Sequence, residues 1–287
     1  MPGPALHGFG LQLPPTRKDS QPIMTNELLI TGIPRSGTSY LCSILNQVRD
    51  TVVINEPEEV LRLLANSSGI PLSDYYRFIR QRIIEGKPVT NKIVDGRFIE
   101  DTNDIDIRTP YVPCVDTPDF LLGTKNTLVY LNTLERILEH MPEAILVACV
   151  RHPHDTIASW QRVTFPHIRH AAPAFLLNHV DGERRRKLER ILATAELAQR
   201  HAMLWHYLAG LVNRHSGRLI VVRYEDMVAD PTGTLERIYA TASIPLTLQQ
   251  PLEPSTPRRH EDAFDAGTLA AIAEHCADSA RLLGYDL

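Results

Sequence analysis

The stretch Gly32-Ile33-Pro34-Arg35-Ser36-Gly37-Thr38-Ser39 fits the pattern of a phosphate-binding loop, with four residues between its two glycines. An apolar run at residues 28–30 precedes it, and apolar residues at helical spacing follow it. In a strand–loop–helix unit, backbone N–H groups and the positive end of the helix point at one spot, which stabilises an anion there. The loop therefore predicts an anion site, although a turn that binds nothing is the alternative reading of the loop alone.

One position departs from the nucleotide-kinase version of this pattern. The loop carries Thr38 where those enzymes place a lysine, and it carries Arg35 earlier. The backbone cradle is thus kept while the lysine that reaches the terminal phosphates of ATP is lost. We expect the loop to hold a phosphate-like group without the usual ATP geometry.

Strand-like runs alternate with helix-like stretches along the chain, which is typical of a parallel sheet covered by helices. We therefore predict an α/β, three-layer P-loop-like fold with a central, mainly parallel sheet. Residues 1–25, rich in proline and glycine, are predicted to be a flexible tail, and residues 26–287 a single domain. The strand candidates are residues 27–31, 51–54, 120–123, 144–150 and 218–222.

Three stretches add detail to this organisation. Residues 66–118 and 165–182 break the strand–helix rhythm, and we expect them to be insertions that cover the site of a second substrate. Residues 184–213 predict one long helix. Its basic start, Arg184-Arg185-Arg186-Lys187, is interpreted as a solvated face rather than a binding patch.

Composition excludes several classes of protein. The chain has 287 residues, 43% of them hydrophobic, and a formal net charge of -4, which argues against a nucleic-acid partner. Its four cysteines are far apart, and its twelve histidines form no metal-ligand pattern, so we expect no disulfide framework and no metal. The most apolar run is too short to span a bilayer. We expect a cytoplasmic protein without a transmembrane segment, and leave its oligomeric state open.

A second anion-binding feature follows the apolar run at residues 144–150. A nucleotide hydrolase or kinase typically places a Mg²⁺-binding aspartate at the end of this strand, whereas this chain has Arg151. The helix predicted next carries Ser159. Because a guanidinium binds phosphate with two parallel hydrogen bonds, Arg151 and Ser159 suit a second phosphate, held without metal. Taken alone, Arg151 could equally be a surface salt-bridge partner.

These two segments resemble the sulfotransferases that use 3′-phosphoadenosine 5′-phosphosulfate (PAPS), including their bacterial members. Residues 34–41 look like the 5′-phosphosulfate loop of that family, and residues 151–160 are similar to its 3′-phosphate segment. The resemblance continues through residues 123–127 and 222–227. It implies transfer of a sulfuryl group from PAPS to a hydroxyl or amine, with 3′,5′-adenosine bisphosphate as product and a small-molecule or glycan acceptor.

The resemblance also implies roles for individual residues. Arg35 and Lys125 would stabilise charge on the transferred group, and Glu56 would be the base, as in the tyrosylprotein and several bacterial sulfotransferases. The histidine base of cytosolic members is absent, because Asn126 and Thr127 follow Lys125; a nearby histidine stays an alternative to Glu56. The donor-binding residues would be Arg35, Ser36, Gly37, Thr38, Ser39, Tyr40, Arg151, Ser159, Tyr224, Arg258 and Arg259.

Two other functions compete with sulfuryl transfer. An ATP- and Mg²⁺-dependent small-molecule kinase predicts a lysine in the loop and an acidic residue at position 151, and the sequence has neither. A non-catalytic nucleotide-binding protein could keep the anion cradle and lose turnover. The presence of Lys125 and Glu56 argues against that second alternative without excluding it.

Overall fold

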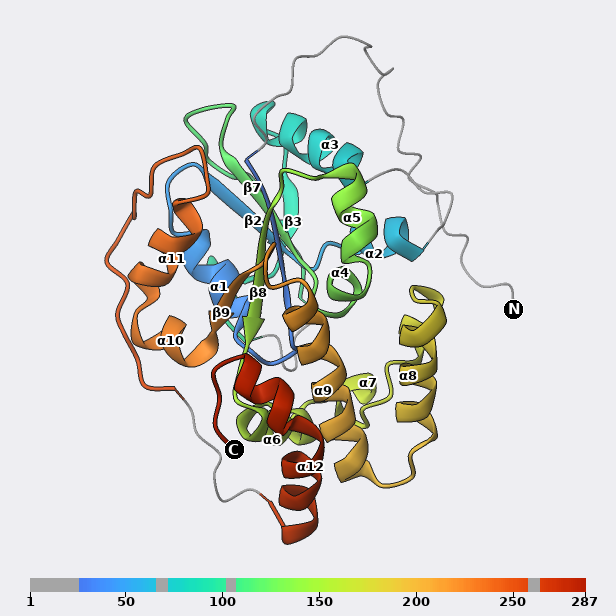
Figure 1. The fold of residues 1–287 in the computed structure, drawn as a ribbon. Coiled ribbons are helices and arrows are strands. Elements are labelled where there is room, and N and C mark those ends of the chain that lie inside the picture. The colour runs from blue at the N-terminus through green and yellow to red at the C-terminus, as the bar shows by residue number, and fades with distance from the viewer. Residues whose placement is uncertain (1–25, 66–71, 102–106, 258–263) are drawn as a thin grey trace, which may run out of the picture.

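A parallel five-stranded sheet forms the centre of the molecule (Figure 1). The computed structural model describes residues 26–65, 72–101, 107–257 and 264–287. All five strand candidates are confirmed to within about two residues, and every pairing in this sheet is parallel, as predicted. The strand order is β2-β7-β1-β8-β9. The strands are β1 (Glu27–Gly32), β2 (Thr51–Asn55), β7 (Leu121–Lys125), β8 (Ile145–Val150) and β9 (Ile220–Arg223).

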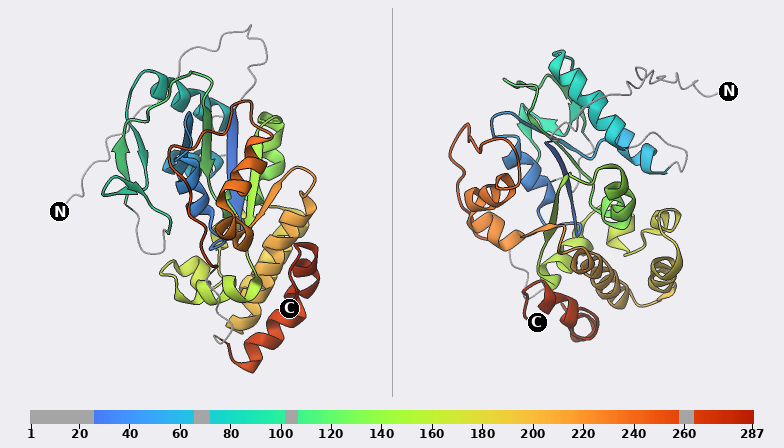
Figure 2. Two further views of the ribbon diagram at one scale, coloured as in Figure 1. Left: turned by 90° about the vertical axis from the view of Figure 1, so that its left-hand side faces the viewer. Right: turned by 45° about the horizontal axis from the view of Figure 1, so that its top comes forward.

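Helices cover both faces of this sheet, which gives the predicted three-layer α/β architecture (Figure 2). Side chains alternate along β1, so that Leu28 and Ile30 pack into one core and Leu29 into the other. The first core is closed by α1 (Thr38–Leu45), α10 (Tyr224–Ala229) and α11 (Pro231–Tyr239). The second is closed by α3 (Leu72–Ile84), α4 (Leu128–Asn132), α5 (Leu134–His140), α6 (Pro153–Arg162), α9 (Leu197–Arg214) and α12 (Ala266–Leu282).

The two predicted insertions have secondary structure of their own. After α2 (Glu58–Ala65) and α3, the first contains two short antiparallel pairs, β3 with β6 and β4 with β5. The second contains α7 (Pro166–Arg169) and a 3₁₀ helix, η1 (Ala174–Asn178). The bounds of the short strands are β3 (Val89–Asn91), β4 (Ile93–Val94), β5 (Arg97–Phe98) and β6 (Thr109–Tyr111).

The prediction of one long helix over residues 184–213 is wrong. The segment forms α8 (Gly182–Ala193) and then α9, with an extended break at Thr194. The hydroxyl of Thr194 donates to the carbonyl of Arg190 at 3.0 Å, so the side chain competes for the backbone at the end of α8. Apolar spacing continues across the break, and periodicity alone therefore did not indicate it.

Some predictions fall outside the described residues: the tail at residues 1–25, and Arg258 and Arg259. In the part of the chain that the structure describes, none of the helices combines the length and apolar character needed to cross a bilayer.

Candidate active site

Two glycines shape the loop that follows β1. Gly32 has φ of 130°, and a Cβ there would lie 2.1 Å from the carbonyl oxygen of Cys149 in β8. The next residue, Ile33, donates its N–H to that same carbonyl at 2.9 Å. Gly37 has φ of 80°, and a Cβ there would lie 2.6 Å from the ring of Tyr224. Both positions therefore require glycine, because the loop backbone passes directly against β8 and α10.

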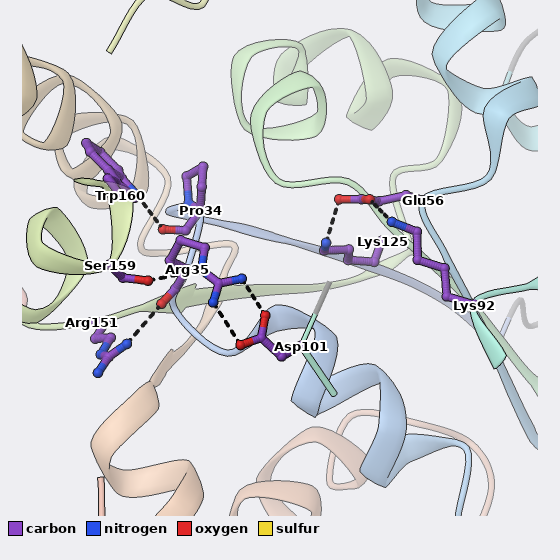
Figure 3. Close-up of polar contacts among 9 residues, drawn as sticks. All are labelled: Pro34, Arg35, Glu56, Lys92, Asp101, Lys125, Arg151, Ser159 and Trp160. Atoms are coloured by element: carbon purple, nitrogen blue, oxygen red, sulfur yellow. Dashed lines mark hydrogen bonds and ion pairs between the residues drawn. The ribbon is translucent and has the colours of Figure 1, made fainter. Parts of the chain in front are cut away.

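The loop is held in place by α6 (Figure 3). The indole N–H of Trp160 donates to the carbonyl of Pro34 at 2.9 Å. Arg35 has φ of 71°, a left-handed conformation that is strained for a residue with a Cβ, and its Nε donates to Ser159 Oγ at 3.0 Å. These contacts fix the strained backbone and direct the guanidinium of Arg35 into the site.

Arg151 lies beside this loop, directly after β8. One of its terminal nitrogens is 3.5 Å from the carbonyl oxygen of Arg35, and its guanidinium stacks over the ring of Tyr224 at 4.4 Å. Burial lowers the pKa of the Arg151 guanidinium from its ordinary value. The structure thus brings Arg35, Arg151, Ser159 and Tyr224 together.

One buried hydroxyl of the loop lacks a hydrogen-bond partner among the described residues, and the start of α1 has no side-chain cap. The N-cap of α1, Gly37, provides no side-chain cap, and the first N–H groups of a helix have no partner within it. The hydroxyl of Ser36 is buried and makes no hydrogen bond within the described segments. Together with the hydroxyls of Thr38 and Ser39, these groups suit an anion that accepts several hydrogen bonds.

Glu56 lies just beyond β2 between two lysines (Figure 3). Its two carboxylate oxygens accept hydrogen bonds from Lys125 Nζ at 2.6 Å and from Lys92 Nζ at 2.5 Å. The lysine side chains are 4% and 3% exposed, whereas that of Glu56 is 28% exposed. Burial opposes ionisation of Glu56, but the charges of Lys125 and Lys92 outweigh it and lower its pKa to about 2. The carboxylate is therefore ionised and partly accessible.

The first insertion also holds the backbone of Glu56. Glu56 has φ of 53°, and its carbonyl accepts a hydrogen bond from Arg108 at 2.5 Å. Lys92 and Arg108 both come from the insertion, and neither was predicted as a site residue. No local pattern marks these two residues, because single basic residues between short strands are common on protein surfaces.

An acidic residue of the same insertion contacts the loop at residues 32–39. Asp101 accepts two hydrogen bonds from the terminal nitrogens of Arg35, at 2.7 and 2.9 Å (Figure 3). This is the bidentate geometry with which an arginine also binds phosphate or sulfate. Asp101 would therefore compete with an anionic ligand for Arg35.

Arg35, Glu56, Asp101, Lys125 and Arg151 line one pocket of about 490 Å³ at the carboxyl ends of the strands. Every described residue of the predicted site lines it except Ser36, which is buried beneath the loop. His167 was not predicted; burial lowers its pKa although the negative charge of Glu56 raises it. Other lining residues that the sequence did not indicate are Glu100, Asp101, Thr127, Leu128, Phe165, Ile168, Val228, Ser255 and Thr256.

The loop at residues 32–39, Arg151 and the Glu56–Lys125 pair thus line one pocket of a P-loop-like α/β fold. Comparison with known families is more specific: a model described as "Sulfotransferase family" matches residues 27–248. The match spans more than half of the chain, so this protein belongs to the sulfotransferase family.

Comparisons with individual proteins are less close. The sulfotransferase STF9 from Mycobacterium avium aligns with 92% of this chain and 73% of its own, with 16% identity and a TM-score of 0.40. The sulfotransferase STF1 from Mycobacterium tuberculosis aligns over 88% and 71%, with 14% identity and a TM-score of 0.37. A comparison with curated protein sequences finds no significant match.

Proposed function

We propose that this protein transfers a sulfuryl group from PAPS to a hydroxyl or amine of a small-molecule or glycan acceptor. Membership of the sulfotransferase family supports the reaction type. The observation that carries the proposal furthest is that the phosphate-binding loop, Arg151 and the Glu56–Lys125 pair open into one pocket. That pocket has the size typical of small-molecule sites.

The residues present suit the donor. PAPS supplies an activated sulfuryl group and a 3′-phosphate by which it is anchored. The buried Ser36 hydroxyl, the uncapped start of α1 and the fork of Arg35 would donate hydrogen bonds to the phosphosulfate, and Arg151 and Ser159 would bind the 3′-phosphate. We assign donor binding to Arg35, Ser36, Gly37, Thr38, Ser39, Tyr40, Arg151, Ser159 and Tyr224, with Arg258 and Arg259 as further predicted contacts.

Lys125 and Arg35 are assigned to stabilise negative charge during transfer. Lys125 is almost fully buried, so its charge acts through a medium less polarisable than water. Fixed charges of this kind, aimed where charge develops, make large contributions to group transfer. Loose transition states of this type demand little push from the nucleophile, by analogy with phosphoryl transfer.

Glu56 is assigned to take the proton from the acceptor. Held between two lysines, with its pKa lowered to about 2, it is a weak base. If Lys125 turns to an anionic oxygen of the donor, Glu56 keeps Lys92 alone and its pKa rises towards the ordinary value. Glu56 would then become a stronger base only when the donor is bound. Lys92 would orient it throughout.

His167 is a second candidate for the base, favoured by its place in the same pocket and by burial, which lowers its pKa and so favours the neutral imidazole that a base requires. It comes from the second insertion and Lys92 from the first. Their positions support the proposal that both insertions, near residues 66–118 and 165–182 of a single domain, cover the acceptor.

The four cysteines are free, in keeping with a reducing cytoplasm.

The direct test incubates the protein with PAPS and a panel of alcohols, phenols, sugars and amines, and searches for products by mass spectrometry. We expect at least one acceptor to gain the mass of SO₃, in the presence of EDTA, with 3′,5′-adenosine bisphosphate released in equal amount. Acceptor phosphorylation with ATP and Mg²⁺, without any sulfated product, would instead identify the kinase alternative.

A further inference from the structure

A second cleft of about 440 Å³ lies between α8 and α9, and it shares no lining residue with the proposed donor pocket. Its rim is basic. Arg184, Lys187 and Arg190 recur at successive turns of α8, and Arg214 belongs to α9. His206 of α9 and His275 of α12 complete the set, and the lining contains no carboxylate. This concentration of positive charge contrasts with the formal net charge of -4 for the chain.

The floor of the cleft is apolar. Ile191 and Leu211 are each 2% exposed, and Met203 and the ring of Tyr207 lie between α8 and α9. Gly210 stands in the middle of α9 and lines the same cleft; a Cβ there would meet nothing within 4 Å among the described residues. Glycine destabilises a helix interior relative to alanine. At this position its lack of a side chain leaves space over the floor of the cleft.

Carboxylates that lie outside the lining balance only part of the positive charge at the rim. Arg184 pairs with Glu135 at 2.7 Å and Lys187 with Glu183 at 2.8 Å, and Arg190 and Arg214 add two further guanidiniums. The pKa of His206 is lowered by burial and, further, by the positive charges of Lys187 and His275, which outweigh Asp278. The groups facing the cleft thus create a positive potential above an apolar surface.

We propose that this cleft is a binding site for an organic anion with an apolar body, such as a medium-chain carboxylate. The carboxylate would be held by the guanidiniums of the rim, and the apolar chain would lie over the floor in the space beside Gly210. The exposed side chains of Arg185, Arg186 and Lys187 agree with the sequence-based interpretation of a solvated face, and the proposal adds a binding role for Arg184 and Lys187. The proposal does not rest on the proposed sulfuryl transfer, because the two pockets have no lining residue in common.

The test is calorimetric titration of the full-length protein with octanoate. Octanol serves as the uncharged chain and inorganic sulfate as the anion without a chain. Three variants locate the binding. Arg190→Gln removes one rim charge, Gly210→Leu fills the space over the floor with a residue that favours a helix, and Arg186→Gln removes a neighbouring charge that does not line the cleft.

We expect octanoate to bind more tightly than octanol or sulfate. Arg190→Gln and Gly210→Leu should each weaken binding by about tenfold, and Arg186→Gln should leave it unchanged. Circular dichroism confirms that each variant is folded. Equal binding of octanol or sulfate, an absence of octanoate binding, or equal affinities of the Arg190→Gln and Arg186→Gln variants would each overturn the proposal.

Discussion

Glu56 combines a left-handed backbone with a carboxylate whose two oxygens each hold a buried lysine. At the scale of single residues we predict that Glu56→Gln lowers turnover of aliphatic alcohols by about 10²–10⁴-fold, the range of a lost general base. Phenols should lose less, because they ionise more easily. Steady-state kinetics with both acceptor classes measures this. If His167→Asn reproduces that selective loss and Glu56→Gln does not, the base is His167.

Asp101 occupies the fork of Arg35 that the proposal assigns to the phosphosulfate. The Asp101→Asn variant removes the competing negative charge, and we predict that it tightens binding of 3′,5′-adenosine bisphosphate by about three- to tenfold. Calorimetric titration gives the affinity. Asp116→Asn, at a carboxylate that pairs with Arg49, is the matched control and should change nothing. Weaker binding by Asp101→Asn would mean that Asp101 positions Arg35 for the ligand instead.

At the scale of elements, the junction of β1 and the loop depends on Gly32. A Cβ there would lie 2.1 Å from backbone of β8, which cannot move without breaking the sheet. We predict that Gly32→Ala lowers the free energy of unfolding by about 3 kcal/mol or more. Gly86→Ala is the control, because Gly86 also has positive φ but meets nothing within 4 Å; it should cost only about 1 kcal/mol. Urea unfolding measures both.

The elements also show what the sequence could predict and what it could not. The five strands were predictable because each is a short apolar run next to a turn or helix signal. The loop at residues 32–39 was predictable from the spacing of Gly32 and Gly37, and both positions have a positive φ and a close contact that only glycine allows. The break at Thr194 was missed because apolar spacing continues through it. Lys92, Asp101 and Arg108 were missed because their partners are distant in sequence, so no local pattern reports those pairings.

At the scale of the whole molecule, the Glu56 cluster couples stability to pH. The pKa of Glu56 falls from 4.5 to about 2 on folding, so its contribution is fully present above pH 4.5 and is lost as pH falls towards 2. Replacing it with glutamine leaves two buried lysines unpaired, and we predict a loss of about 3 kcal/mol at pH 7.

Urea unfolding of wild type and Glu56→Gln between pH 7 and the lowest pH at which both fold tests this coupling. The difference in unfolding free energy should stay constant down to pH 4.5 and narrow below it. Glu236→Gln, at an exposed position of α11, is the control for loss of a carboxylate without buried partners. A difference that widens on acidification would show that the lysines do not stabilise the ionised form.

The proposed function requires that Arg151 and the loop at residues 32–39 together hold an adenosine nucleotide with a 3′-phosphate, without metal. The most direct measurement is the thermal shift of the protein with 3′,5′-adenosine bisphosphate in EDTA, beside adenosine 5′-monophosphate and ATP with Mg²⁺. We predict that the bisphosphate raises the midpoint most and that Arg151→Ala removes its advantage over the monophosphate. If only ATP with Mg²⁺ stabilises the protein, the proposed binding of a 3′-phosphorylated nucleotide is wrong.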